Sequence, residues 1–300
     1  MVKFEACAIF LLSTSSVLAL QLPSDFKRCP ASLKNKNDCL KDAVQSAFVY
    51  LKHGLPEFNF PGIEPVNIPS MTIGEGTGTV HVVQNFKNVK VYGISSMKVD
   101  HVVQTTTDDG SKMVTTGVID EIRLEADYNL NGKILILPVY GEGKCVIKLT
   151  NTTIITTSVS KHYNKKETVY SKVEDFIVSI DPDKVHFQFD NLFNGDKALG
   201  EQINNILNDQ SKEVYADIRK QYEEAFGIIF KNYANLIYEK VPLNDLYPIE
   251  ELKQKISKER ELELLDILRN KISAEDISSK THLTQATMQT GPSLQVFYKS

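Results

Sequence analysis

The longest hydrophobic pattern in the chain runs from Asp196 to Val241 without a proline. Apolar residues recur along it at steps of three, four and seven, the spacing of one face of an α-helix. Asn194 and Asp196 offer side-chain oxygens to cap its first N–H groups, and Pro242 ends it. The positions on this face are Leu199, Ile203, Ile206, Leu207, Val214, Ile218, Tyr222, Phe226, Ile229, Phe230, Tyr233 and Ile237.

A straight helix of this length does not fit inside a compact domain. It would reach roughly 70 Å, whereas a domain of this size has a diameter of roughly 45 Å. The sequence therefore predicts an elongated fold or a bend, and the weak points are Asn208-Asp209-Gln210-Ser211 and Gly227. A coiled-coil arm is the alternative reading, but no heptad repeat persists.

Between Met71 and Asp190 the hydrophobic period changes to two, which predicts β-strands. Three turn signals divide this region: Asp108-Asp109-Gly110, Asn131-Gly132 as a tight hairpin, and Asp181-Pro182-Asp183. The clearest alternating strand places its apolar residues at Ile122, Leu124, Ala126, Tyr128 and Leu130.

A second, shorter helix is predicted from Leu40 to Leu51 with Asp38 as its cap, followed by an extended proline-rich run from Phe60 to Pro69. Strands with one apolar face need a cover, and the long C-terminal helix offers one. The predicted fold is therefore α+β: a highly curved antiparallel sheet wraps the long helix, and the short N-terminal helix closes one end.

Composition limits the function classes. The chain is 42% hydrophobic, enough for a sizeable core, and has a net charge of -4. No basic stripe is present, so nucleic acid is not predicted as a partner.

The first nineteen residues resemble a secretory signal peptide. Lys3 precedes an apolar run from Ala6 to Leu12, and Val17-Leu18-Ala19 fits a cleavage site. Secretion is predicted, with an uncleaved anchor as the alternative. No other stretch has the length of apolar sequence that stable membrane insertion requires.

In an oxidising compartment, Cys29 and Cys39 are expected to form a disulfide across a short polar stretch. Cys145 shares a strand face with Ile147 and Leu149, so a buried free thiol is predicted there, and a metal site is the weaker alternative. Asn151-Thr152-Thr153 is a glycosylation sequon, although the strand phase would turn Asn151 inward.

Motifs for catalysis are not found. Gly74, Gly76 and Gly78 do not fit a dinucleotide-binding fingerprint, and a turn or bulge explains them better. The six histidines are scattered, and no Ser–His pair can be nominated for an esterase. The protein is predicted to be no enzyme, with no cofactor and no metal.

Apolar side chains beyond those of a minimal core suggest a ligand tunnel between sheet and helix, although ordinary packing would explain each residue singly. The helix cluster around Phe226 is expected to lie opposite the strand aromatics. The predicted lining consists of Val44, Phe48, Tyr128, Phe187, Phe189, Tyr222, Phe226, Ile229, Phe230 and Tyr233.

Several segments, in order, resemble the insect takeout and juvenile-hormone-binding protein family. They are Cys29–Leu40, Gly62–Met71, Gly132–Gly143, Asn191–Gly195, Leu199-Gly200, Ile203-Asn204 and Tyr247-Pro248. The resemblance implies a long helix wrapped by a curved sheet, an internal tunnel for an elongated lipid, and no catalysis.

Two departures from the family pattern refine this expectation. The hormone carriers join the sheet to the long helix through a second disulfide, and the helix here has no cysteine, so the takeout branch fits better. A fatty acid or quinone is then as good a ligand as a juvenile-hormone-like terpenoid. The chain also continues past Pro248 to Ser300.

The predicted organisation is a signal peptide at 1–19, a ligand-binding domain at 20–248 and a tail at 249–300. The tail is predicted to be a charged helix, with Leu252, Ile256, Leu265, Leu268 and Ile272 at helical spacing, followed by disorder. The predicted function is a secreted, monomeric carrier of a hydrophobic ligand. The alternative is an extracellular interaction factor that binds a protein partner or receptor through its tail.

Overall fold

A computed structural model describes residues 20–76, 78–134, 136–248 and 260–265. The chain divides into two units, Met1–Pro248 and Ile249–Ser300. In the second unit residues 260–265 are helical and expose Leu262, Leu264 and Leu265. The rest of the predicted tail helix, like the predicted signal peptide, lies outside the described residues.

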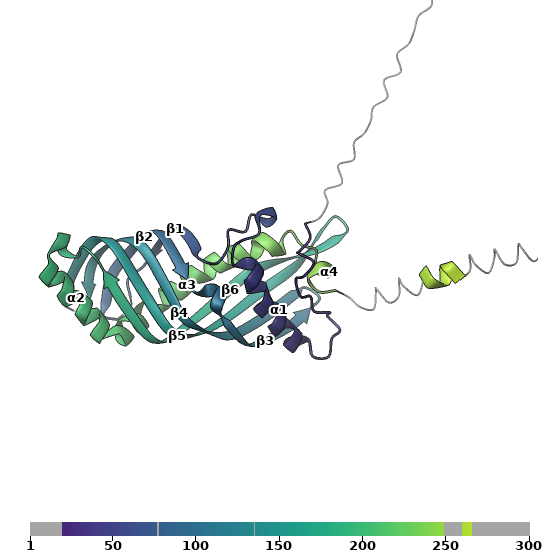
Figure 1. Cartoon of the computed structure of the whole chain (residues 1–300), viewed down its shortest axis with the longest axis horizontal. Coiled ribbons are helices and arrows are strands. Elements are labelled where there is room, and N and C mark those ends of the chain that lie inside the picture. The colour runs from purple at the N-terminus through teal and green to yellow at the C-terminus, as the bar shows by residue number, and fades with distance from the viewer. Residues whose placement is uncertain (1–19, 77, 135, 249–259, 266–300) are drawn as a thin grey trace, which may run out of the picture. The chain divides into compact units, whose positions relative to one another are not determined.

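In the first unit, helices flank a six-stranded antiparallel sheet (Figure 1). The strands are β1 (Val66–Ile73), β2 (Val80–Tyr92), β3 (Lys98–Thr107), β4 (Gly110–Ile134), β5 (Leu137–Lys165) and β6 (Thr168–Phe189). The α-helices are α1 (Lys36–Leu51), α2 (Lys197–Asp209), α3 (Ser211–Tyr238) and α4 (Leu243–Leu246). Short 3-10 turns occupy Pro56–Phe58, Ile94–Ser96 and Phe193–Gly195.

The sheet runs in the order β1-β2-β4-β5-β6, and β3 pairs with the first part of β4. The first part of β4 therefore pairs with β3, and a later part pairs with β2. The side chains alternate as predicted, since Ile122, Leu124, Ala126, Tyr128 and Leu130 are all buried. The α+β fold with a large curved antiparallel sheet is confirmed.

The predicted long helix breaks at Gln210, within the weak segment that the sequence indicates. Gln210 has φ -111° and ψ 25°, which separates α2 from α3. Asp196 caps α2 as predicted, accepting from the Leu199 N–H at 3.1 Å. Gly227 does not bend α3. A Cβ there would lie 2.5 Å from the Phe176 carbonyl oxygen, so glycine lets α3 approach β6 closely.

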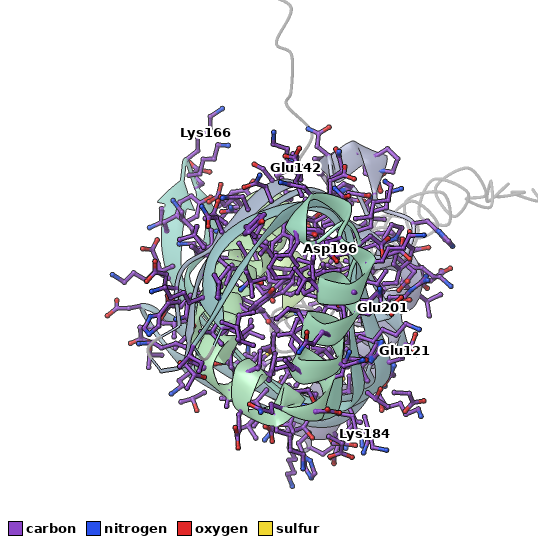
Figure 2. All side chains as sticks on the ribbon, turned by 90° about the vertical axis from the view of Figure 1, so that its left-hand side faces the viewer. Glu121, Glu142, Lys166, Lys184, Asp196 and Glu201 are labelled. Atoms are coloured by element: carbon purple, nitrogen blue, oxygen red, sulfur yellow. A yellow bond between two sulfur atoms is a disulfide. The ribbon has the colours of Figure 1, made fainter. Side chains whose placement is uncertain are left out.

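The break gives the two helices different positions on the sheet. α3 packs along β6 and also contacts β1 and β2. α2 lies at one end of the sheet and α1 at the other (Figure 1). Viewed from the α2 end, the strands and helices form a ring with side chains inside it, while Glu142 and Lys184 point away from it (Figure 2).

β6 ends the sheet, so one side of its backbone has no neighbouring strand. Three asparagines take the place of that strand. In each pair the side-chain oxygen accepts from a β6 N–H and the side-chain nitrogen donates to the carbonyl of the same residue, at 2.8–2.9 Å. The pairs are Asn204 with Phe189, Asn208 with Phe187, and Asn235 with Val173.

Ile180 is held in the same way by two side chains of α3. Its N–H donates to Glu223 Oε1 at 2.8 Å, and its carbonyl accepts from the Tyr215 hydroxyl at 3.2 Å. Arg219 donates to the same Glu223 oxygen at 2.7 Å and so keeps that carboxylate in place. We call these contacts of Asn204, Asn208, Tyr215, Glu223 and Asn235 with β6 the edge seal.

α3 also contacts the side of the sheet opposite β6, at the segment with Gly74, Gly76 and Gly78 between β1 and β2. Asp217 accepts from the N–H groups of Gly78 and Val80 at 2.5 and 2.6 Å. A Cβ at Gly76 would lie 2.6 Å from Asp217 Oδ2, so the glycine gives the carboxylate access to this backbone. This segment connects β1 to β2. α3 is therefore bonded to both sides of the sheet, to the β1–β2 connection through Asp217 and to β6 through the edge seal.

One of the predicted tight turns is confirmed and two are wrong. Thr107 pairs with Gly110 around the Asp108-Asp109 tip. Asn131-Gly132 instead lies inside β4, and the hairpin turns between Ile134 and Leu137. Gly132 is needed there for close packing, because a Cβ would lie 2.0 Å from the His81 carbonyl oxygen.

Asp181-Pro182-Asp183 is also not a turn, because β6 continues through it. Proline is tolerated at this position since β6 is an edge strand. Opposite it, Asn151 has φ 49°, and the alternation of β5 changes phase there. Asn151 is therefore exposed and bonded to Asp183, so the predicted inward orientation is wrong.

The N-terminal region differs from prediction in two details. α1 begins at Lys36, so Asp38 lies in its first turn and is not the cap. The proline-rich run is extended only from Val66, because Gly62 has φ +97° and turns the chain before β1.

Replacing one asparagine of the edge seal tests its strength. Asn235→Ala is expected to lower the free energy of unfolding by about 2–4 kcal/mol, because the N–H and carbonyl of buried Val173 both lose their partner. Urea unfolding measures the loss. Asn232→Ala, at an exposed position of the same helix, is the control and should change stability little. Equal effects of the two substitutions would contradict the edge seal.

Candidate functional site

The interior between the sheet and α3 is apolar, and the predicted lining residues belong to its hydrophobic clusters. Tyr128, Phe187, Phe189, Tyr222 and Phe226 are buried. Val44, Phe48, Ile229, Phe230 and Tyr233 are half-buried and pack against the clusters.

These aromatic residues form two groups, which corrects the expectation that they face each other. Near α2, the rings of Tyr128 and Phe189 lie edge to face with centroids 5.0 Å apart. Toward the other end of α3, Phe230 contacts Tyr233, which in turn contacts Phe60. The groups are separated because α3 runs antiparallel to β6, which places α2, and not the Phe226 cluster, beside Phe187 and Phe189.

An apolar pocket of about 230 Å³ lies beneath α1, and we call it the α1 pocket. α1 contributes Val44, Ala47 and Phe48 to its wall, and the end of α3 contributes Ile237. Phe26 of the N-terminal segment also lines it. Two of the predicted lining residues, Val44 and Phe48, therefore share one pocket.

A smaller cavity of about 20 Å³ lies near α2, and we call it the inner cavity. Two further predicted residues, Phe187 and Phe189, line it, together with Ile218 of α3. Its lining is apolar except for Gln84 of β2. Ile218 and Ile237 are on the same helix, so the two cavities are separated by roughly 28 Å along α3.

The remaining predicted residues lie on α3 between the cavities or, for Tyr128, on β4. Tyr222, Phe226, Ile229, Phe230 and Tyr233 follow Ile218 and precede Ile237 in the chain. Their side chains occupy the interior between the α1 pocket and the inner cavity. The predicted residues therefore lie along one axis of the interior, but they do not line a single open cavity.

Buried hydroxyls are the main polar groups of this interior. Tyr222 donates to Gln84 Oε1 at 3.0 Å, and Tyr128 donates to the Asp190 carbonyl at 2.5 Å. Burial raises the pKa of both tyrosines, so both stay neutral at physiological pH. Both hydroxyls are paired within the protein and uncharged, so the interior stays neutral.

The cysteines are arranged as the sequence predicts. Cys29 and Cys39 are joined in a disulfide, which ties the first turn of α1 to the N-terminal segment. Cys145 is a free, buried thiol on the inward face of β5. Burial raises the pKa of this thiol to about 12.

Among the residues that the structure describes, no cluster of three or more His, Cys, Asp and Glu side chains is arranged to hold a metal ion. None of the helices described is long and apolar enough to cross a bilayer.

Sequence reasoning missed Gln84 as part of the interior. The residue lies in the alternating run Val80, Val82, Gln84, Phe86, in the phase that faces the core. A glutamine in an inward phase between two apolar neighbours was the available signal. Tyr238, which lines the α1 pocket, lies beside predicted helix positions and carried no comparable signal.

The fold is α+β, with a large curved antiparallel sheet around an apolar interior that holds two cavities. The family model for haemolymph juvenile hormone binding protein (JHBP) matches residues 7–248. The chain belongs to this family, and the predicted resemblance is confirmed.

Relatives and a solved structure agree with this assignment. The chain is 25% identical over 234 residues to the circadian clock-controlled protein daywake of Drosophila melanogaster, covering 76% of this chain and 89% of that protein. Daywake of Drosophila yakuba is also 25% identical, over 238 residues. The crystal structure of Takeout 1 from Epiphyas postvittana matches with a TM-score of 0.66 at 22% identity, covering 74% of this chain and all of that chain. This likeness supports the fold.

The buried thiol gives a test of how tightly the interior is closed. In the folded protein Cys145 is expected to react with iodoacetamide at pH 8 at the rate of unfolding, because burial keeps it neutral and covered. Its folded pKa is raised, so its contribution to stability is complete below the unfolded pKa of about 8.5 and is lost as the pH rises toward about 12. Mass spectrometry during a urea titration measures the labelling. Fast labelling without urea would show an open interior.

Proposed function

We propose that this protein is a secreted carrier that binds one elongated hydrophobic ligand between its sheet and α3. Suitable ligands are a terpenoid of the juvenile-hormone kind, a fatty acid or a quinone. The observation that supports the proposal best is the apolar α1 pocket, which lies on the same axis as the buried aromatic residues and the inner cavity. Family membership supports the same class of ligand.

The energetics of such a complex are favourable. Burial of about 400 Å² of a terpenoid or acyl chain contributes about 10 kcal/mol of gross transfer free energy. Immobilising ligand and protein costs 4 kcal/mol or more, so micromolar to sub-micromolar affinity is expected. No catalytic step is assigned, since binding alone accounts for the apolar interior.

The α1 pocket must widen to hold such a ligand. Sites for drug-sized ligands occupy about 300–1,000 Å³, more than the 230 Å³ found beneath α1. The pocket can widen by a shift of α1, because Leu40 is the only residue of this helix that is fully buried. The disulfide holds the first turn of α1, so its C-terminal part is the freer end.

Secretion is part of the proposal and is supported by the signal-like residues 1–19, the disulfide and the haemolymph family. The exposure of Asn151 makes its sequon accessible to glycosylation. We further propose that the domain acts as a monomer, because the ligand site is built within one chain. The tail from 249 to 300 lies outside the family match and is proposed as a surface for a protein partner.

A substitution that fills the α1 pocket tests the proposal. Ala47→Trp places an indole in the pocket and is expected to weaken binding of the fluorescent probe 1-aminoanthracene more than tenfold. Val49→Trp is the matched control, because Val49 is 73% exposed on the same helix and should leave binding unchanged. Fluorescence titration measures both, and circular dichroism checks the fold.

Wild-type protein that binds no probe, and that yields no apolar molecule on solvent extraction after secretion, would overturn the carrier function. That result would favour the interaction factor, which would act through its surface or through the tail with its exposed Leu262, Leu264 and Leu265.

A further inference from the structure

Gln84 is a polar side chain in an otherwise apolar row. It lies on the inward face of β2 between Val82 and Phe86, opposite Leu130 of β4, and only 5% of its surface is exposed. Burial of an amide costs free energy unless its hydrogen-bonding groups are paired. The position therefore calls for a partner at each end of the amide.

One end of the Gln84 amide has a partner within the protein. The Tyr222 hydroxyl donates to Gln84 Oε1 at 3.0 Å, which fixes the amide and leaves Nε2 as its donor. Among the described residues no acceptor bonds to Nε2. Gln84 is at the same time the single polar residue of the inner cavity's lining.

The inner cavity is poorly suited to hold a water molecule. Its volume of about 20 Å³ would admit one, but a buried water needs two to four polar partners and this lining offers one side chain. A carbonyl oxygen at the end of a hydrophobic molecule is satisfied by one donor. The carbon atoms that follow it would contact the apolar residues Leu207, Val214 and Ile218.

We propose that Gln84 Nε2 donates a hydrogen bond to a terminal carbonyl oxygen of the ligand. The ligand class is then a long apolar chain that ends in an ester, acid or ketone group. This polar end lies in the inner cavity beside α2, and the chain points along α3 toward the α1 pocket, which requires the side chains between the two cavities to move aside. The inference rests on the proposed carrier function and adds to it the polarity and direction of the ligand.

Two matched probes test the inference: methyl dodecanoate, which carries the carbonyl, and tridecane, which does not. Each is titrated against protein loaded with 1-aminoanthracene. The ester gives up hydrogen bonds to water when it binds, so the readout is the ratio of the ester and tridecane affinities in each protein. Gln84→Met keeps the length of the side chain but removes the donor, and this ratio is expected to be about tenfold lower in Gln84→Met than in wild-type protein.

Gln188→Met is the control, because Gln188 is an exposed glutamine on β6 and its loss should leave the ratio unchanged. A second readout uses methyl dodecanoate labelled with ¹³C at the carbonyl. In wild-type protein its infrared carbonyl band is expected at lower frequency than in heptane, as for a hydrogen-bonded ester, and in Gln84→Met it returns to the heptane position. If Gln84→Met does not fold, the wild-type band decides alone.

The outcomes separate the two levels of the proposal. An affinity ratio that is the same in Gln84→Met and in wild type, or an unshifted carbonyl band, would overturn the role of Gln84 and leave the carrier function standing. If wild-type protein binds neither 1-aminoanthracene nor methyl dodecanoate nor tridecane, the carrier function itself is overturned.

Discussion

The structure depends on hydrogen bonds that helix side chains make to the open edge of β6. A curved sheet that does not close on itself leaves a row of unpaired N–H and carbonyl groups, which is a site for aggregation. Here Asn204, Asn208 and Asn235 each satisfy both groups of one residue, and Glu223 with Tyr215 does the same for Ile180. Because Asp217 holds the opposite end at Gly78 and Val80, α3 closes the tube without forming a strand.

This closure explains why the two apolar cavities lie along α3. The groups of α3 that bond to β6 include the buried Tyr215, and the helix faces the sheet through Ile218, Tyr222 and Phe226, all buried. The α1 pocket and the inner cavity lie at the two ends of that buried face. α1 covers one end with a single fully buried residue and is bonded through Gln45 to Met97 and Val99, whereas α2 is bonded to β6 by two asparagines.

Much of the fold could be predicted because it depends on local periodicity. The inward alternation of β4, the break near Gln210 and the Cys29–Cys39 bridge all follow from residues near in sequence. The wrong turns have a different cause, which lies in contacts between strands. Gly132 is needed because the His81 backbone of β2 lies close to it, and Pro182 is tolerated because β6 is at the edge of the sheet. The same limit applies to the site. Buried aromatic residues could be predicted from their position in the hydrophobic pattern, but which of them are in contact depends on the antiparallel run of α3 along β6. The role of Gln84 depends on its hydrogen bond with Tyr222, which lies far away in the sequence.

Native-state hydrogen exchange, read by NMR, tests the edge seal most directly. The amides of Val173, Ile180, Phe187 and Phe189 face helix side chains and not a strand. They are expected to exchange as slowly as the interior amides of β4, with the free energy of global unfolding. Exchange that is faster by several orders of magnitude, as at a frayed edge, would contradict the claim that α2 and α3 close the sheet.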